Sequence, residues 1–129
     1  MFRVVWRVRR VRRNLQGSRG EYMQHKEQAR ALAVSRLQLF NEKYGFSIKK
    51  ISIKNQKTMW GSCSRKGNLN FHYKIALLPD YLADYIIVHE LCHLEEFNHS
   101  RVFWGLVARS IPNHRELRGK LKHHKDSNQ

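Results

Sequence analysis

Hydrophobic residues recur along the chain with spacings that predict strands at some positions and helices at others. Near the start, apolar and basic residues mostly alternate, so we expect a strand with one apolar and one basic face over residues 1–15. Ser18 and Glu21 match a helix-capping pattern, and Gly45 is typical of a helix end. A long amphipathic helix is predicted between them, because apolar residues return every three or four positions: Ala29, Ala33, Leu37, Phe40 and Tyr44.

The middle of the chain contains two more predicted strands. Ile51 and Ile53, flanked by lysines, indicate a short strand, and residues 55–67 form a predicted loop that carries Trp-Gly-Ser-Cys at 60–63. Between Leu69 and Ile75, apolar residues alternate with polar ones, which is typical of a half-buried strand.

Two helices are predicted in the C-terminal half. Asp80 is a suitable N-cap for the first, which is apolar on nearly every side from Leu82 to Leu94 and should therefore be buried. Asn98 is the expected end of this helix, because asparagine accepts left-handed backbone angles. Ser100 can cap the second helix, whose apolar side holds Val102, Phe103, Leu106 and Val107.

Length and composition indicate a single domain over residues 1–129. The chain has 129 residues, of which 41% are hydrophobic, enough to form one core. It has no apolar run of about 18 residues, so no membrane helix is expected. Two cysteines are too few for a disulfide-stapled secreted protein, and arginines interrupt the start before a signal sequence could form. We expect a cytoplasmic protein, with an organelle transit peptide at the Arg-rich start as the alternative.

The most informative motif is His89-Glu90-Leu91-Cys92-His93, an H-E-x-x-H sequence inside the buried helix. Residues four apart lie on one face of a helix, so both imidazoles can reach one zinc ion. Glu90 lies about 100° around the helix axis from His89, where it can act on a water without ligating the metal. Zinc lowers the pKa of such a water to about 7. Glu90 can then take a proton from it during attack on a carbonyl and pass the proton to the leaving amine.

A zinc site of this kind needs a third protein ligand. His99 lies beyond Asn98, where the chain can turn back toward the metal. Glu95 and Glu96 are the rival ligands, but imidazole is the commoner zinc ligand, and we favour His99.

Two alternatives to this site remain open. The buried imidazoles and carboxylate could instead satisfy one another in a salt-bridged core network. Cys63 and Cys92 could contribute to a structural zinc site, although the chain has no C-x-x-C pair, and we expect Cys92 to be a packed core thiol. The remaining histidines lack a comparable spacing and are expected at the surface: His25, His72, His114, His123 and His124.

Several segments together resemble the YgjP-like zinc metallopeptidase family, which is related to the SprT-like and WLM proteases. They are Trp-Gly-Ser-Cys-Ser at 60–64, Val-His-Glu-Leu-Cys-His-Leu at 88–94, Asn-His-Ser at 98–100 and Phe-Trp at 103–104. The resemblance implies an α+β fold of the minimal zincin type, with a small β-sheet packed on the active-site helix and a long supporting helix. It also implies a peptidase acting on proteins or peptides, with His89, His93 and His99 as ligands of Zn²⁺ and Glu90 as the catalytic carboxylate.

In zincins, the strand before the active-site helix commonly binds the backbone of the substrate. By resemblance, the predicted strand from Leu69 to Ile75 has this role, with Asn70, Phe71 and His72 as substrate-binding residues. The alternative is an interior strand that has no free edge.

The charge of the chain suggests a second kind of partner. Lys and Arg number 25 against 10 Asp and Glu, a formal net charge of +15. The basic residues form two clusters. One lies in the predicted first strand: Arg3, Arg7, Arg9, Arg10, Arg12 and Arg13. The other lies in a basic tail over 115–129, which we expect to be a short helix or frayed: Arg115, Arg118, Lys120, Lys122 and Lys125.

Such clusters attract nucleic acid without reading its sequence. Since SprT-like proteases act on proteins attached to DNA, recruitment to nucleic acid is a coherent hypothesis, and a basic surface that serves solubility is its alternative. The competing function for the whole chain is a non-catalytic, basic, nucleic-acid-associated module whose zinc is structural.

Overall fold

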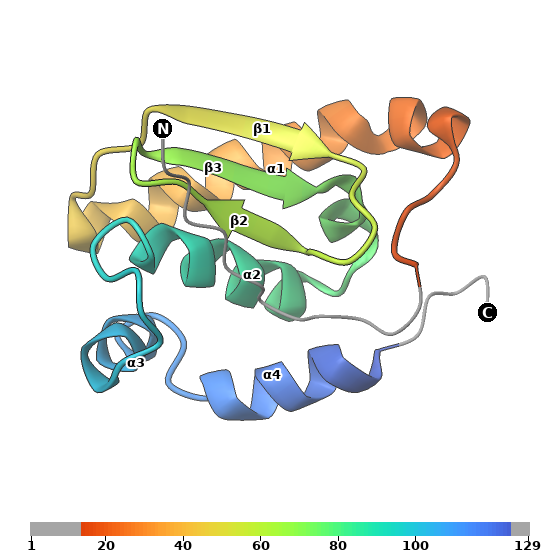
Figure 1. Cartoon of the computed structure of the whole chain (residues 1–129). Coiled ribbons are helices and arrows are strands. Elements are labelled where there is room, and N and C mark those ends of the chain that lie inside the picture. The colour runs from red at the N-terminus through yellow and green to blue at the C-terminus, as the bar shows by residue number, and fades with distance from the viewer. Residues whose placement is uncertain (1–13, 125–129) are drawn as a thin grey trace.

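The computed structural model describes residues 14–124, which form an α+β fold with one small sheet (Figure 1). The elements are α1 (Arg19–Tyr44), β1 (Lys50–Lys54), β2 (Gly61–Cys63), β3 (Asn68–His72), the 3-10 helix η1 (Tyr73–Leu77), α2 (Asp80–Cys92), α3 (Arg101–Ala108) and α4 (His114–His123). The predicted basic strand lies outside the described residues except for Asn14 and Leu15, which are not in a strand.

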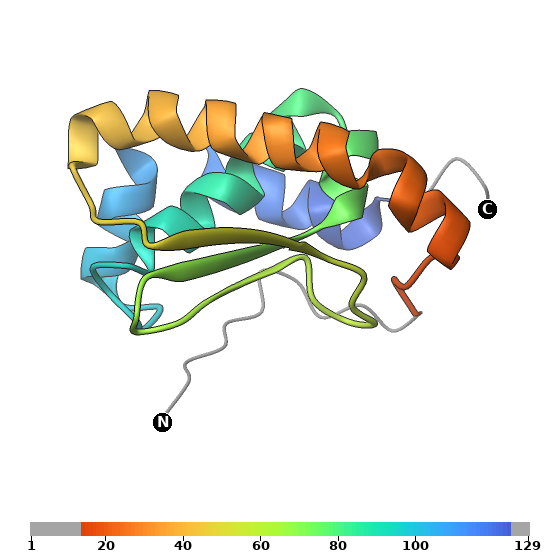
Figure 2. The same cartoon turned by 90° about the horizontal axis from the view of Figure 1, so that it is seen from above.

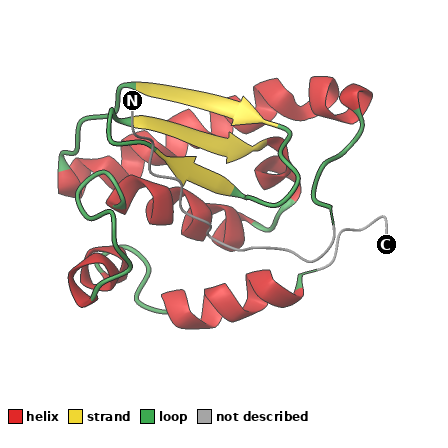
Figure 3. Ribbon diagram, in the orientation of Figure 1, coloured by secondary structure: helices red, strands yellow, loops and turns green. Residues whose placement is uncertain are grey.

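The three strands form a mixed sheet in the order β1-β3-β2, shown in yellow in Figure 3. β1 runs parallel to β3, with Ile53 opposite Phe71, and β2 runs antiparallel to β3, with Ser62 opposite Asn70. β3 is therefore the central strand, hydrogen-bonded to a neighbour on each side.

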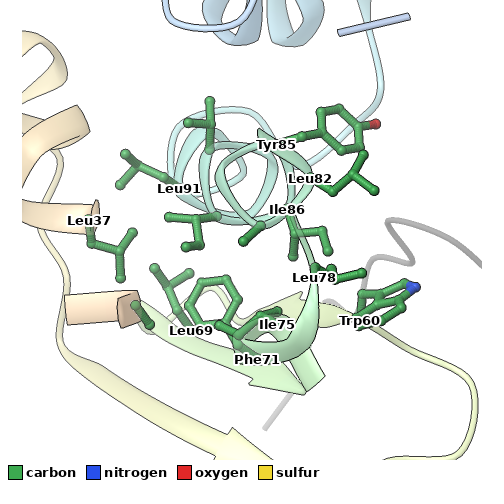
Figure 4. Packing of buried hydrophobic residues seen from close by; sticks show 14 of the residues in the cluster. Leu37, Trp60, Leu69, Phe71, Ile75, Leu78, Leu82, Tyr85, Ile86 and Leu91 are labelled. Atoms are coloured by element: carbon green, nitrogen blue, oxygen red, sulfur yellow. The ribbon is translucent and has the colours of Figure 1, made fainter. Parts of the chain in front are cut away.

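Helix α2 lies at the centre of the molecule. α1 and α2 cover one face of the sheet (Figure 2), and α2 contacts α3 and α4 on its other side. Neighbours on both sides explain why α2 is apolar around nearly its whole circumference. Leu69 and Phe71 of β3 pack against Ile86 and Leu91 of α2 in this core (Figure 4).

The long helix forms as its sequence predicts. The Ser18 hydroxyl accepts a hydrogen bond from the backbone N–H of Glu21 at 3.0 Å, and Gly45 ends α1 with φ of 71°. A positive φ of this size favours glycine, which has no Cβ. Ala29, Ala33 and Leu37 are buried, and Phe40 and Tyr44 are half-buried on the same side.

The strand predictions need two corrections. The predicted loop over 55–67 contains β2, a short strand that lacks the length and alternation by which strands are found in a sequence. The predicted strand from Leu69 to Ile75 ends at His72, whose ring Nδ1 accepts the backbone N–H of Lys74 at 3.1 Å and so begins η1. This strand is also not half-buried, because its polar side chains Asn70 and His72 are buried too.

The helix predictions also need corrections. α2 begins at Asp80 after Pro79 at the N-cap, and it ends at Cys92 rather than Asn98. The chain leaves α2 in a turn, in which the His93 ring Nδ1 donates to the carbonyl of Glu96 at 2.8 Å. The basic tail is helical to His123, as α4, and 125–129 lie outside the described residues.

Ser100 caps α3 as predicted, with its hydroxyl accepting the Phe103 N–H at 3.2 Å. Val102 points to solvent, however, and is 60% exposed, because α3 packs through Phe103 and Val107. Among residues 14–124, no helix is both long and apolar enough to cross a membrane.

Candidate metal centre

Three histidines converge at the C-terminal end of α2. His89 lies in the last turns of the helix, His93 is its C-cap, and His99 comes from the loop before α3. The Nε2 atom of His99 lies 3.1 Å from Nε2 of His93 and 3.2 Å from Nε2 of His89. Together they form a group whose ligand atoms all lie within 4.8 Å of one another.

The rings are held in place by the residues around them. The His93 Nδ1 donation to the Glu96 carbonyl directs the other ring nitrogen, Nε2, toward His99. Phe103 stacks on His93 with ring centroids 4.2 Å apart, and Trp104 stacks on His99 at 5.7 Å. Both aromatic rings belong to α3, so the fold of α3 against α2 fixes the orientation of two of the imidazoles.

The rival ligands do not join this group. Within the described residues, the metal-capable group at this site contains the three histidines and neither Glu95 nor Glu96. Cys63 and Cys92 are free thiols, and burial raises the pKa of each to about 12. Within the described residues, the group of side chains that could hold a metal includes neither thiol, which argues against a structural zinc site built on them.

Electrostatics keep the imidazoles neutral. Burial, with the charge of Arg118, lowers the pKa of His89 to about 3, and burial lowers that of His99 to about 4. Burial and the neighbouring His89 lower the pKa of His93 to about 2. A neutral imidazole is the form that donates a nitrogen lone pair to a metal.

Glu90 lies beside this group and is completely buried. Its Oε2 atom is 3.2 Å from Nδ1 of His89, whereas Oε1 has no hydrogen-bond partner among the described residues. Burial raises the pKa of Glu90 well above its usual range. A buried carboxylate oxygen without a partner is costly, and such groups are found where a ligand or a reaction requires them.

The donor set therefore fits a metal ion. Three neutral imidazoles present nitrogen atoms to one point, and imidazole nitrogen is a preferred ligand of zinc. A core network of ion pairs explains the geometry less well. A neutral His89 cannot form an ion pair with Glu90, and Oε1 of Glu90 has no partner within the described part of the chain.

The structure also brings β2 to this site, which the sequence analysis missed. A Cβ atom on Gly61 would lie 2.9 Å from Cγ and 3.2 Å from Oε2 of Glu90, so the strand passes directly against the carboxylate. A glycine within the Trp-Gly-Ser-Cys segment was the signal for such a close approach. Trp60 and Cys63 are buried on either side of it.

The predicted substrate-binding strand is wrong in one respect. β3 is bonded to β1 and β2, so Asn70, Phe71 and His72 offer no free strand edge to a substrate. Their side chains are buried: the Asn70 amide donates to the Ser62 hydroxyl at 3.0 Å, and the His72 ring bonds the Gln56 carbonyl at 2.9 Å. His72 is therefore not a surface residue as predicted.

Comparisons with known proteins agree with this geometry. The family model described as YgjP-like, metallopeptidase domain, matches residues 9–124. A search of the curated proteins finds no match. The crystal structure of the metallopeptidase zymogen of abylysin from Pyrococcus abyssi is similar in fold, with a TM-score of 0.63 at 24% identity over 73% of this chain and 97% of that chain.

The family match covers most of the chain, and it implies a metal cofactor at a site such as the three-histidine group. The α+β fold and its likeness to a metallopeptidase structure agree with that match. The protein belongs to the YgjP-like metallopeptidase family.

Proposed function

We propose that this protein is a zinc peptidase in which His89, His93 and His99 hold the ion and Glu90 is the general base. The observation that supports the proposal is the convergence of three imidazole nitrogens beside a buried carboxylate, one oxygen of which has no hydrogen-bond partner in residues 14–124. Protein or peptide is the substrate, and the reaction is hydrolysis of a peptide bond.

The chain's own residues would act on the proton and the substrate. Zinc, when bound, would act as a Lewis acid that polarises the scissile carbonyl and lowers the pKa of the attacking water. Glu90 accepts a proton from the attacking water at Oε1, the atom that has no partner in the described chain, and then donates it to the leaving amine. Burial raises the pKa of Glu90 well above its usual range, which makes the carboxylate a stronger proton acceptor than an exposed one.

The edge strand β2 is the proposed place for the substrate backbone. The Trp60 carbonyl accepts from the His72 N–H, and the Ser64 N–H donates to the Asn68 carbonyl, so these backbone groups point toward β3. In an antiparallel pair the direction alternates, and the backbone N–H and C=O groups of Gly61 and Cys63 therefore point away from β3, toward the outer edge of the sheet. No strand pairs with that edge within residues 14–124. An extended peptide added there would pass beside Glu90.

The opposite edge of the sheet is closed by side chains of α1. The carbonyl of Ile51 accepts from Arg30 at 3.2 Å, and the carbonyl of Ile53 accepts from the Tyr22 hydroxyl at 3.1 Å. β1 therefore has its outward acceptors already bonded, which leaves β2 as the better edge for strand addition.

Glu90→Gln tests the proposal. This variant keeps the size of the side chain but cannot act as a base, so we expect zinc content to stay at the wild-type level while peptide cleavage falls at least about 100-fold. Equal cleavage of a broad peptide library by the zinc-loaded wild type and variant would overturn the enzymatic proposal. That result would favour the alternative predicted from the sequence, a non-catalytic basic module with structural zinc.

The proposed location is the cytoplasm. Both cysteines are buried free thiols in the structure, which suits a reducing compartment. Recruitment to nucleic acid stays a prediction from the sequence, because the cluster of arginines from Arg3 to Arg13 lies outside the described residues.

A further inference from the structure

A basic groove opens between α3 and α4, next to the histidine group. Its volume is about 450 Å³, and it is lined by Arg101, Trp104, Gly105, His114, Arg115 and Arg118. Neither the family match nor the similar fold assigns a role to this groove.

The groove carries positive charge that the described chain does not neutralise. Arg101, Arg115 and Arg118 are all exposed, and none of them forms an ion pair with an acidic side chain in residues 14–124. Glu116, the acidic residue of α4, pairs instead with Lys120 at 3.3 Å. Three guanidinium groups thus face one hollow without a carboxylate among its lining residues.

Trp104 joins this groove to the candidate metal centre. Its ring stacks on His99 with centroids 5.7 Å apart and on His114 with centroids 4.9 Å apart. The guanidinium of Arg118 lies 5.9 Å from the centre of the same ring. A ligand in the groove would therefore be separated from a proposed metal ligand, His99, by one aromatic ring.

We propose that this groove binds an acidic side chain of the peptide substrate, aspartate or glutamate, close to the scissile bond. The inference rests on the proposed function and specifies its substrate class. Arginine is suited to this role, because its planar guanidinium donates two parallel hydrogen bonds to a carboxylate.

The same charges could attract nucleic acid, but the groove fits a carboxylate side chain better. Proteins that bind single strands use aromatic rings as stacking platforms for bases. The Trp104 ring is already in contact with two imidazoles and a guanidinium, which reduces the ring surface available to a base. The hollow also lies next to the candidate catalytic site, because Trp104 in its lining stacks on His99.

Two peptides that differ only by Asp against Asn near the cleavage site test this inference. Binding of each labelled peptide to the zinc-loaded Glu90→Gln protein is measured by fluorescence anisotropy, and KM and kcat are measured with the Glu90 enzyme. We expect the Asp peptide to bind at least about tenfold more tightly, with the difference in KM rather than kcat. The double variant Arg101→Gln/Arg115→Gln should lose most of this preference.

Lys50→Gln/Lys54→Gln is the matched control. It removes the same amount of charge from exposed positions at the two ends of β1, across the sheet from α4 (Figure 1). We expect it to keep the preference for the Asp peptide. A preference that falls equally in both double variants would overturn the inference, because the effect would then come from overall charge.

The outcomes separate the groove from the proposed function. If the Glu90 enzyme cleaves both peptides with equal KM and they bind equally well, the groove inference is wrong and the peptidase proposal stands. If neither peptide is cleaved at any zinc concentration, the proposed function fails, and the inference that depends on it fails too. If the groove variants weaken binding of a single-stranded oligonucleotide but leave the peptide preference unchanged, the groove serves nucleic acid and the inference is overturned.

Discussion

At the scale of single residues, the contact between Gly61 and Glu90 is the most constrained part of the site. An added Cβ at Gly61 would lie 2.9 Å from Cγ of Glu90, closer than real contacts allow, and at a tight 3.1 Å from the Asn70 carbonyl. Either β2 or the carboxylate must then move, and a small displacement of a catalytic group is costly.

We therefore expect Gly61→Ala to lower kcat at least about tenfold while zinc content, measured by elemental analysis, is unchanged. Gly119→Ala is the control, because its Cβ would meet nothing within 4 Å in the interior of α4. That substitution should leave kcat unchanged and raise stability by up to about 1 kcal/mol. Full activity of Gly61→Ala would contradict the placement of Glu90 against β2.

Tyr85 offers a test of the core beside the site. Its side chain is fully buried, its hydroxyl has no hydrogen-bond partner among the described residues, and burial raises its pKa to about 12. An unsatisfied buried hydroxyl destabilises the folded state, so Tyr85→Phe should be neutral or stabilising by up to about 1 kcal/mol. Urea unfolding of the two proteins measures this difference. A loss of more than about 1 kcal/mol would show that the hydroxyl makes a hydrogen bond after all.

At the scale of elements, an ion pair connects the long helix α1 to α2, the helix that carries His89 and Glu90. Arg36 donates from Nε to Oδ1 of Asp84 at 2.8 Å and from Nη2 to Oδ2 at 2.7 Å, a paired geometry in which the two side chains are 33% and 16% exposed. The hydrogen bonds to Asp84 raise the pKa of Arg36 further.

Asp84→Asn should lower the free energy of unfolding by about 1 kcal/mol, since the pair is partly screened by solvent. Glu27→Gln is the matched control: its contact with Arg30 is 3.7 Å long, and the Glu27 side chain is 75% exposed. That substitution should cost less than about 0.5 kcal/mol. Equal losses in the two variants would contradict the view that the Arg36–Asp84 pair fixes α1 on α2.

Elements with regular patterns could be predicted from the sequence, and elements defined by tertiary contacts could not. α1 has a capping pair, a terminal glycine and a repeating apolar face, and each of these acts locally. β2 spans only Gly61–Cys63 and exists because it pairs with β3, which lies later in the chain. The early end of α2 depends likewise on a bond from the His93 ring to Glu96.

The same distinction between local patterns and tertiary contacts applies to the residues of the candidate site. Two histidines four residues apart on a helix share a face whatever surrounds them, so the spacing of His89 and His93 was sufficient to predict their proximity. The position of His99 depends on the turn after α2 and on the stacking of Trp104, which spacing alone does not reveal. Alternation of residues does not reveal strand order in a sheet, so the sequence could not decide between an edge strand and an interior strand for β3, and the structure shows the interior one.

At the scale of the whole molecule, the histidines make stability depend on pH. Burial lowers the pKa of His89, His93 and His99 to about 3, 2 and 4, whereas in the unfolded chain they protonate near pH 6.5. Between those values the unfolded state binds more protons, so the stability supplied by these groups is present above about pH 6.5 and is lost as pH falls. Burial raises the pKa of Glu90, so this group makes the folded state more stable as pH falls. It is a single group, and the three histidines together have the larger effect on stability.

We therefore expect the zinc-free protein to unfold at a lower temperature at pH 5 than at pH 7, as measured by calorimetry after chelation. The difference should become smaller in His99→Asn, because one of the three titrating groups is removed. A melting temperature that is equal or higher at pH 5 would contradict the burial of neutral imidazoles. Zinc at pH 7 should raise the melting temperature of the wild-type protein, because an ion that binds only the folded state stabilises it.

The most direct test of the whole account is the zinc content of the purified protein, measured by elemental analysis after dialysis. We predict about one zinc per chain in the wild type and in Glu90→Gln, and a fall to less than about one tenth in His93→Ala. A wild-type protein without bound zinc after reconstitution, or a His93→Ala variant that keeps its full content, would contradict the three-histidine metal centre on which the proposed function depends.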